Sequence, residues 1–463
     1  MRGVSLGSLP SLLSLSSQLR ALYWPDQLGE CPSVCPANPS WLRETHVPFT
    51  FVHAADLHLA SPFQGLAMAA EGREAIVAHL RDAAFLAFER LVDLCIERDA
   101  QFLLLAGDTF EDEECSVRDM FRFRDGLARL ADAGIGAFAI HGNHDPFKGD
   151  RPEVALPDNT HVFGDETAET VGVPELPGVT ITGVSYRTKR EARKLARQYV
   201  CPPESGFHIG LLHAQVGGDQ STNLYATCTV EQLRNAGFHY WALGHIHERR
   251  TFSTNPTIAY SGNIQGRNPK ETGERGALVV TADAATGLAE TEFVPLQVVR
   301  WETAEVPIAG LDSLDALEER IAEHTEALAE ECRPSSLVLR IQLTGRGRLN
   351  ADLRREDATT DLRERLRNSQ PLTPPFVWIE SLQLACGADL DFAGRREGDD
   401  LAGEILRRAD ALAEDREWLD KALAPLFAHR RAKHALAGLP DEVRAQLLRE
   451  AAENCVEALD GEA

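Results

Sequence analysis

The sequence lacks long apolar runs, and its cysteines are not arranged in pairs. No stretch of the chain approaches the roughly 18 uninterrupted apolar positions that a membrane-spanning helix requires. The nine cysteines are dispersed, there is no CxxC, and Cys31 and Cys35 are the only close pair. An odd, scattered set indicates reduced thiols rather than a disulfide framework or a zinc knuckle. We therefore expect a cytoplasmic protein that has no membrane partner.

Positive charge is scarce as well. The 47 Lys and Arg residues stand against 71 Asp and Glu residues, which leaves a formal net charge of −24. Because a phosphate backbone is normally bound by a basic patch, this balance argues against a general-purpose nucleic-acid binder. Either the substrate is small, or metal ions and a partner protein supply the missing positive charge.

The length of 463 residues suggests several domains, and the sequence pattern changes along the chain. Residues 1–47 mix Leu and Ser without a clean apolar core or a small-residue cleavage site. We expect a disordered leader or a mis-assigned start there, rather than a signal peptide. Residues 48–300 alternate buried-strand runs with helical periodicity. Residues 301–390 show the pattern of a smaller α/β unit, and residues 391–463 that of a helical tail. The resemblance given below implies that the first is a capping domain and the second a partner-binding region.

Residues 48–300 carry the pattern of a layered α/β domain. The apolar runs FTFVHAA, QFLLLAG and GIGAFAI predict buried strands, and helical periodicity covers residues 73–98 and 117–130 between them. Later runs, FHIGLLH and YWALG among them, predict further strands. Strands that alternate with helices predict sheets with both faces covered.

Charged and polar side chains stand where five of these predicted strands end. They are Asp56 and His58 in ADLH, Asp108 in AGDTF, Asn143, His144 and Asp145 in HGNHD, His213 after FHIGLL, and His245 and His247 in GHIH. In open α/β sheets the carboxyl ends of the strands border one crevice, so we expect these side chains to converge. Nitrogen and oxygen donors without thiolate suit Mn²⁺, Fe²⁺ or Zn²⁺, and one carboxylate can bridge two ions.

Each of these short motifs also has a plain structural reading, since GD or GNHD alone is usually a turn. All five elements in this order, each at a strand end, indicate a metal site instead. Gly107, Gly142 and Gly244 each directly precede a ligand position, where a sharp turn and a close backbone approach are easiest without a Cβ. Isolated histidines such as His53 and His161 are expected to be structural.

The series ADLH, GDTF, GNHD, H and GHIH resembles the calcineurin-like metallophosphoesterases. Within that superfamily, FVHAADLHLASPF, AIHGNHDPF and NAGFHYWALGHIHERR are most similar to the SbcD/YhaO-type DNA repair exonucleases. The resemblance covers residues 49–300 well, the two later regions loosely and the leader not at all. It implies a sandwich of two β-sheets flanked by helices, a small α/β cap and a helical C-terminal tail. Ala60 departs from it, since a Gly or an acidic residue often stands there in relatives, and we expect this to alter substrate contacts only.

The resemblance also implies a role for each site residue. One metal would be held by Asp56, His58, Asp108 and His247. The other would be held by Asn143, His213, His245 and again Asp108, which bridges the two ions. His144 would face the scissile phosphate without ligating, and Asp145 would orient its ring. Two cations would lower the pKa of a shared water toward about 7, so that hydroxide attacks phosphorus while His144 assists the leaving oxygen.

The implied function is a metal-dependent DNA exonuclease that hydrolyses phosphodiester bonds in DNA repair. It would use two divalent ions, for which Mn²⁺ is expected and Fe²⁺ and Zn²⁺ are the alternatives. Such nucleases usually work with a coiled-coil ATPase of the SbcC or YhaN kind. A homodimer is a further possible assembly. The alternative is a small-molecule phosphoesterase, either a phosphatase or a cyclic-nucleotide phosphodiesterase, which would share every metal ligand. A non-catalytic scaffold subunit fits an intact ligand set less well.

Two further segments bear on the substrate and the partner. GNIQGRNPK places Arg267 and Lys270 on a Gly-rich loop where they could touch backbone phosphates, and ordinary surface charge is an equal reading. In the tail, an apolar stripe either docks on the ATPase or packs within the tail itself. Its members are Leu401, Ile405, Leu412, Leu419 and Leu423.

Overall fold

The computed structural model describes residues 48–61, 74–174, 176–217, 225–428 and 439–461. The predicted leader, residues 1–47, lies outside these ranges and stays a prediction. Among the described residues, no helix is both long enough and apolar enough to cross a membrane.

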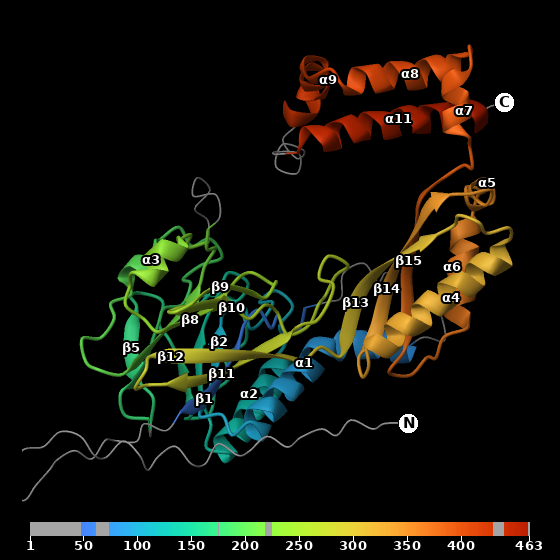
Figure 1. Cartoon of the computed structure of the whole chain (residues 1–463). Coiled ribbons are helices and arrows are strands. Elements are labelled where there is room, and N and C mark those ends of the chain that lie inside the picture. Colours follow the sequence, from blue (N-terminus) through green and yellow to red (C-terminus); the bar gives the residue numbers. More distant parts are fainter. Residues whose placement is uncertain (1–47, 62–73, 175, 218–224, 429–438, 462–463) are drawn as a thin grey trace, which may run out of the picture. The chain divides into compact units, whose positions relative to one another are not determined.

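Two six-stranded sheets form the body of the first domain (Figure 1). The first has the order β12-β11-β1-β2-β3-β4, with β1 (Phe49–Ala54), β2 (Phe102–Ala106), β3 (Gly136–Ile140), β4 (Thr160–Val162), β11 (Gly276–Asp283) and β12 (Leu288–Pro295). The second has the order β5-β6-β7-β8-β10-β9, with β5 (Glu169–Gly172), β6 (Val179–Gly183), β7 (Phe207–His213), β8 (Tyr240–Gly244), β9 (Arg250–Thr254) and β10 (Thr257–Tyr260). Strands β1 to β4 run parallel, as do β6, β7, β8 and β10. Their carboxyl ends therefore share an edge in each sheet.

The two sheets enclose one apolar core, and each covers a further core on its outer face. Residues alternate along β1: Phe51 packs in the cluster between the sheets with Phe102 and Ile209, whereas Val52 belongs to the cluster under the helices. The Phe51 and Phe102 rings stack with centroids 4.9 Å apart. Burial of one such side chain contributes about 1.5–3 kcal/mol.

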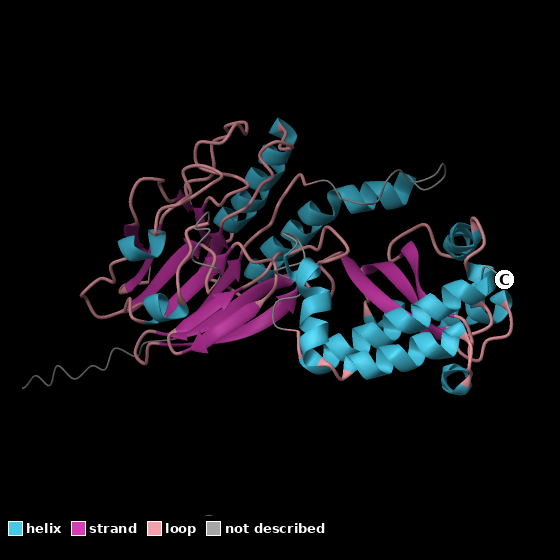
Figure 2. Cartoon of the chain, turned by 90° about the horizontal axis from the view of Figure 1, so that it is seen from above, coloured by secondary structure: helices cyan, strands magenta, loops and turns pink. Residues whose placement is uncertain are grey.

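Helices cover the outer faces of both sheets, as Figure 2 shows in cyan beside the magenta strands. The first sheet is covered by α1 (Glu74–Glu97) and α2 (Val117–Asp132), and the second by α3 (Val230–Arg234) and the short 3-10 helix η1 (Leu195–Gln198). Helix α2 begins at a capping box, because Ser116 accepts from Asp119 N at 3.3 Å while the Asp119 carboxylate accepts from Ser116 N at 2.9 Å. The predicted fold class, two β-sheets flanked by helices, is confirmed.

The predicted cap unit contains a three-stranded parallel sheet of its own. Its strands are β13 (Val299–Pro307), β14 (Ser336–Arg346) and β15 (Val377–Gly387), and its helices are α4 (Leu314–Glu331), α5 (Asn350–Leu353) and α6 (Ala358–Asn368). Leu317, Ile321 and Leu366 of the helices pack with strand residues in one core. The predicted boundary at residue 300 falls inside β13.

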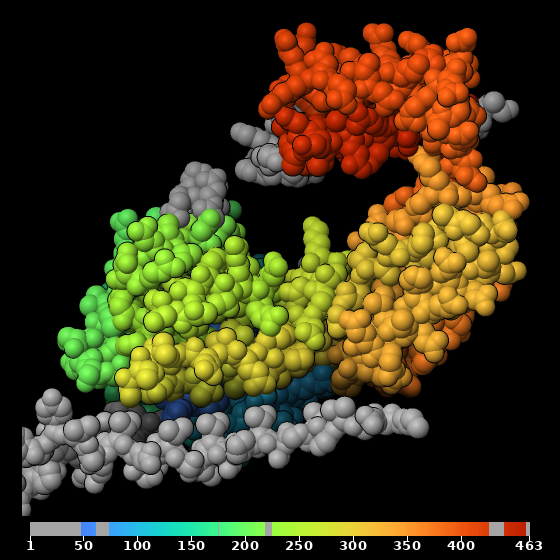
Figure 3. Space-filling model, in the orientation of Figure 1, coloured from blue at the N-terminus to red at the C-terminus, as the bar shows by residue number. Residues whose placement is uncertain are grey.

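The C-terminal region is helical, as predicted, and appears in red in Figure 3. Its helices are α7 (Phe392–Glu397), α8 (Leu401–Ala413), α9 (Arg416–Ala428) and α11 (Asp441–Gly461). The predicted apolar stripe divides between two environments. Leu419 is buried with Ala413 and Ala445 inside the tail, whereas Leu401 is 66% exposed. Packing within the tail therefore accounts for part of the stripe.

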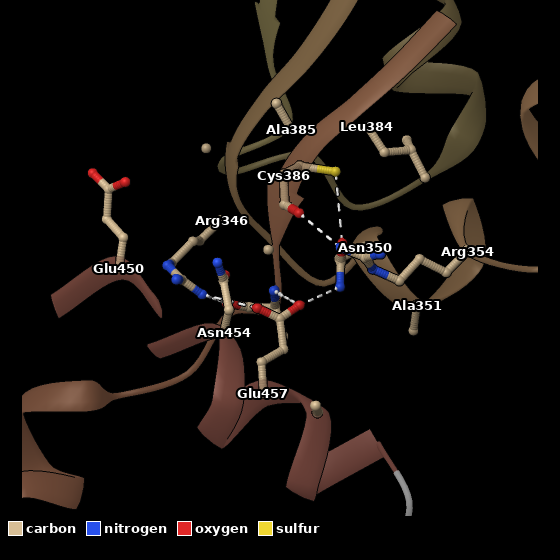
Figure 4. Close-up of a pocket in the computed structure, with 14 residues that line it drawn as sticks. Arg346, Asn350, Ala351, Arg354, Leu384, Ala385, Cys386, Glu450, Asn454 and Glu457 are labelled. Atoms are coloured by element: carbon tan, nitrogen blue, oxygen red, sulfur yellow. Dashed lines mark hydrogen bonds and ion pairs between the residues drawn. The ribbon is translucent and has the colours of Figure 1, made fainter. Parts of the chain in front are cut away.

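A carboxylate from α11 joins the tail to the end of the cap sheet. Oε1 of Glu457 accepts from Asn350 Nδ2 and from Ala388 N, both at 2.8 Å, and Oε2 accepts from Arg346 Nη1 at 3.1 Å. Figure 4 shows Arg346, Asn350 and Glu457 pointing toward one another. The Arg346 guanidinium also pairs with Glu453 at 3.1 Å. We call this group the cap–tail junction.

Candidate metal centre

Hydrogen bonds bring the loops after the strands to one edge. The N–H of Asp56, after β1, donates to Gly107 O, after β2, at 3.0 Å. The second sheet joins this edge through His213 at the end of β7, because its Nδ1 donates to Ala106 O at 2.9 Å. Residues far apart in the sequence therefore meet at the carboxyl ends of the strands, as their positions predict.

Glycines permit the close approaches within this edge. A Cβ on Gly142 would lie 2.2 Å from Oδ1 of Asp108, and one on Gly107 would lie 2.5 Å from Nδ1 of His213. Gly107 also has a φ of +91°. Because any side chain at these two positions would displace a predicted ligand, the glycines before Asp108 and Asn143 are required by the packing.

Asp56, His58 and His247 form a first cluster, in which one ligand atom from each lies within 4.8 Å of the others. The Nε2 atoms of His58 and His247 face each other at 3.1 Å. Nδ1 of His247 donates to the Glu271 carboxylate at 2.8 Å, which leaves the lone pair of Nε2 for the cluster. Oδ2 of Asp108 lies 3.8 Å from His58 Nε2.

Asp56, Asp108 and His213 form a second cluster, again within 4.8 Å. His213 Nε2 lies 3.4 Å from Oδ2 of Asp108 and 3.1 Å from Oδ1 of Asn143. His245 reaches the same amide oxygen, with its Nδ1 at 3.0 Å. Asp108 thus contacts residues of both clusters, which is the place of a bridging carboxylate. All seven predicted metal ligands lie together.

Four of these residues adopt a left-handed backbone conformation, which residues other than glycine rarely do. The φ angle is 52° at Asp56, 46° at His58, 51° at Asp108 and 105° at His245. Such conformations cost about 1–3 kcal/mol each and persist only where the surrounding structure holds them. They concentrate at functional sites, and here they coincide with the predicted ligands.

The buried carboxylates of the two clusters require positive charge. Burial raises the pKa of Asp56 to about 6. Burial also opposes the ionisation of Asp108, but the imidazoles of His213 and His58 outweigh it and hold the pKa of that carboxyl well below its usual range. Burial disfavours the imidazolium of His213, yet Asp108 outweighs this and raises the pKa of His213 to about 9. A proton on His213 supplies one balancing charge, and a divalent cation bound to the neutral imidazole would replace it.

The remaining imidazoles are prepared as ligands. Burial lowers the pKa of His58 to about 4 and that of His245 to about 3, so both rings are neutral at neutral pH. Nδ1 of His58 is buried and lies 3.4 Å from Oε2 of Glu111, without a hydrogen bond to a described residue. Neutral imidazoles, carboxylates and one amide oxygen, with no thiolate, form a donor set that fits two divalent ions of the Mn²⁺, Fe²⁺ or Zn²⁺ type.

Residues 49–249 match the calcineurin-like phosphoesterase family, and residues 301–387 match the middle domain of metallophosphoesterase YhaO. The chain is 32% identical over 298 residues to the uncharacterized metallophosphoesterase YhaO of Bacillus subtilis, which covers 64% of this chain and 72% of the relative. The chain belongs to the YhaO-type calcineurin-like metallophosphoesterases. Membership implies a hydrolase that uses divalent metal ions.

More distant relatives of this metallophosphoesterase are named DNA double-strand break repair protein Mre11. The one from Thermoplasma acidophilum is 25% identical over 227 residues, which is 46% of this chain and 59% of the relative. The one from Archaeoglobus fulgidus is 24% identical over 299 residues, which is 59% of this chain and 64% of the relative. The chain spans less than two thirds of the length of either.

In this metallophosphoesterase, His144 is held beside the two clusters by a carboxylate. Nδ1 of His144 donates to Oε1 of Glu111 at 2.7 Å, and this hydrogen bond raises the pKa of His144 above its ordinary value. The backbone N–H of His144 donates to Oδ1 of Asp108 at 2.8 Å. Its side chain is 41% exposed, so the second ring nitrogen remains accessible to a substrate. His58, Glu111 and His144 also form a third group within 4.8 Å.

The prediction that Asp145 orients the ring of His144 is wrong. Oδ1 of Asp145 accepts from Gly142 N at 2.8 Å, and Oδ2 accepts from Thr109 N at 2.9 Å. The nearest ring contact is Nδ1 of His141 at 3.5 Å. A buried carboxylate must have its oxygens satisfied, and the loop N–H groups do so here. Asp145 therefore braces the backbone of the metal loop.

Sequence reasoning missed two carboxylates that hold the histidines. Glu111 stands three residues after Asp108 in GDTFE, and Glu271 lies in the loop NPKETG. Burial opposes their ionisation, but the histidines that they contact outweigh it and lower the pKa of each to about 2. The only local signal for Glu111 is its place, as an acidic residue, shortly after Asp108. We find no local signal for Glu271.

Proposed function

We propose that this metallophosphoesterase is a DNA exonuclease that hydrolyses phosphodiester bonds with two divalent metal ions, Mn²⁺ first among them. The observation that carries the proposal is the donor set, since the seven predicted ligands lie together, Asp56 belongs to both clusters, and Asp108 of the second cluster lies 3.8 Å from His58 of the first. The relatives named for DNA double-strand break repair support DNA as the substrate. The cellular role would then be in DNA repair.

The residues of the chain divide by task in this proposal. One ion would be held by Asp56, His58, Asp108 and His247, and the other by Asp108, Asn143, His213 and His245. Bound divalent ions supply Lewis acidity, which lowers the pKa of water and neutralises charge on the phosphoryl oxygens. His144, with Nδ1 held by Glu111, would donate a proton from its other nitrogen to the leaving oxygen.

A small-molecule phosphoesterase is the second candidate, because the net charge of −24 repels a polyanion. The local charge near the clusters is different. A cleft of about 420 Å³ beside His247 is lined by Arg249, Lys270 and Arg275 as well as by three glutamates. Arg275 already donates to the backbone oxygens of His247 and Thr272, which leaves Arg249 and Lys270 to contact a phosphate next to the scissile one. Such contacts would support DNA as the substrate over a phosphate monoester.

We also propose that the tail binds a coiled-coil ATPase of the SbcC or YhaN kind. Val443 and Leu447 stand one turn apart on α11 and are 37% and 45% exposed, and Leu401 on α8 is 66% exposed. Exposed apolar side chains at helical spacing suit a partner helix. A basic surface on that ATPase would supply phosphate contacts that this acidic chain lacks.

The substrate is tested by offering the purified protein three substrates with Mn²⁺. Labelled linear DNA, bis-p-nitrophenyl phosphate and p-nitrophenyl phosphate are compared, with Asp108→Asn as the inactive control. Stepwise shortening of the DNA supports the exonuclease. Rapid monoester hydrolysis with intact DNA would favour the small-molecule enzyme instead.

The partner is tested by pull-down of a co-expressed coiled-coil ATPase. The double variant Val443→Asp and Leu447→Asp should lose the ATPase and keep hydrolysis of the small diester. The matched control is Glu450→Ala on the same helix. Pull-down that persists in the double variant would move the partner surface elsewhere.

A further inference from the structure

Arg267 lies beside the metal centre, although it is distant from most of the ligands in sequence. Its side chain is only 13% exposed. Nη1 donates to Oγ of Ser61, in the loop after β1, at 2.8 Å. Nη1 also lies 3.7 Å from Oε2 of Glu111, and Nη2 lies 4.0 Å from Oε1 of Glu271. The guanidinium therefore sits between the two carboxylates that orient His144 and His247.

Each of the two carboxylates makes a shorter side-chain contact with a histidine than with the Arg267 guanidinium. Glu111 makes its short contact with His144, at 2.7 Å, and Glu271 makes its short contact with His247, at 2.8 Å. Glu271 also accepts from the backbone N–H of Arg267, at 2.8 Å. The carboxylates thus hold the guanidinium in place by charge, at distances too long for good hydrogen bonds.

The guanidinium retains unused hydrogen-bonding capacity. Among the described residues, Nε of Arg267 is buried with no hydrogen-bond partner. Of the guanidinium N–H groups, only one on Nη1 makes a short contact with a described residue, namely Ser61. A buried arginine with unsatisfied N–H donors lowers stability unless an anion accepts hydrogen bonds from them. The planar guanidinium can donate two parallel hydrogen bonds, a geometry that matches the oxygens of a phosphate.

We infer that Arg267 is a further catalytic residue, which binds a non-bridging oxygen of the scissile phosphoester beside His144. This inference rests on the proposed phosphoester hydrolysis and does not depend on DNA being the substrate. Charge-assisted hydrogen bonds strengthen as charge grows on the phosphoryl oxygens, so Arg267 stabilises the transition state more than the ground state. The hydrogen bond from Nη1 to Ser61 Oγ holds the guanidinium in place.

The competing explanation is structural, namely that Arg267 merely ties the 262–271 loop to Ser61. Three variants separate the two roles. Arg267→Ala removes the cation, and Arg267→Lys keeps the charge but loses the planar fork. Arg98→Ala is the matched control, because it removes an arginine from the surface ion pair with Glu292.

The first measurement is hydrolysis of bis-p-nitrophenyl phosphate by the Mn²⁺-loaded protein. Arg267→Ala should lower kcat/KM by about 10²-fold, mostly through kcat, with metal content and Tm unchanged. Arg267→Lys should recover part of the loss. Added guanidinium, far below denaturing concentrations, should raise the rate of Arg267→Ala and of no other variant. Arg98→Ala should match the wild type.

The second measurement needs no turnover. Calorimetry of inorganic phosphate binding to the Mn²⁺-loaded protein should show weaker binding in Arg267→Ala than in the wild type. Wild-type kcat/KM and phosphate affinity in Arg267→Ala would overturn the inference, as would lost activity that neither Lys nor guanidinium restores. If DNA stays intact while the diester and phosphate results hold, the nuclease proposal fails and the role of Arg267 stands.

Discussion

The metal centre and the cap–tail junction both contain partly buried charged groups, but they differ in how those charges are stabilised. At the junction, both oxygens of Glu457 have donors, from Arg346, Asn350 and Ala388 N. At the metal centre, Asp56 and Asp108 are buried beside imidazoles that burial drives toward the neutral form, as the low pKa of His58 shows. The hydrogen bonds of the Glu457 carboxylate are thus satisfied at the junction, whereas the metal centre requires further positive charge.

This contrast shows why cavity size is a poor guide to function in this chain. The cleft beside the junction has a volume of about 980 Å³, and Arg346, Asn350 and Glu457 line it. Its polar groups already satisfy one another, so it has the character of a packing boundary. Buried ligand atoms, left-handed backbone and unbalanced charge mark the metal centre instead.

The largest effect should come from the shared carboxylate. Asp108→Asn should abolish hydrolysis of bis-p-nitrophenyl phosphate and lower the bound metal, because a neutral amide cannot balance two divalent ions. Steady-state kinetics and elemental analysis measure the two outcomes. Asp93→Asn, in the exposed ion pair with Arg129, is the control. Near-wild-type turnover of Asp108→Asn with two bound metals would contradict the need for a charged carboxylate at the metal centre, and with it the contrast with the cap–tail junction.

The next largest effect should come from His144 and the carboxylate that holds it. His144→Ala should retain both metals and lose about 10²- to 10⁴-fold in rate, the range for a positioned proton donor. Glu111→Ala should lose less. Because both act on one proton transfer, the double variant should be little slower than His144→Ala. Additive losses, or metal lost from either single variant, would reassign these residues.

A smaller effect, and none on catalysis, is expected at the junction. Glu457→Ala should weaken the attachment of the tail by about 1–3 kcal/mol, because three donors lose their acceptor. Limited proteolysis should cut between the cap and the tail faster, while turnover of the small diester stays unchanged. Glu450→Ala, which lines the same cleft, is the control. A large fall in turnover would tie the junction to the site.

The smallest effect concerns Ala60. Its φ of 68° is left-handed, which costs an alanine about 1–2 kcal/mol, while glycine adds about 0.4–1 kcal/mol of unfolded-state entropy. Ala60→Gly should therefore stabilise the protein by about 1 kcal/mol or less, as denaturant unfolding would measure. Ala131→Gly in α2 should destabilise it by a similar amount. Unfolding curves that reverse this order would show that Ala60 is not strained.

Several strands were absent from the sequence predictions for a common reason. β5, β9 and β12 expose most of their side chains, with little of the apolar alternation that marks a half-buried strand. Each lies at the margin of a sheet and pairs with a single neighbouring strand. Their conformation depends on that pairing, which only the folded chain provides.

The sequence by itself determined the two-layer α/β class and the convergence of the metal ligands. Each ligand lies within a few residues of a buried apolar run, so a local pattern places it at a strand end and topology does the rest. Only the tertiary structure decided which side chains orient and surround those ligands. The contacts of Glu111 with His144, Glu271 with His247 and Arg267 with Ser61 span 33, 24 and 206 residues. Glu111, Glu271 and Arg267 lie in loops. The direction of a loop side chain is set by tertiary packing, and a periodic sequence pattern does not predict it.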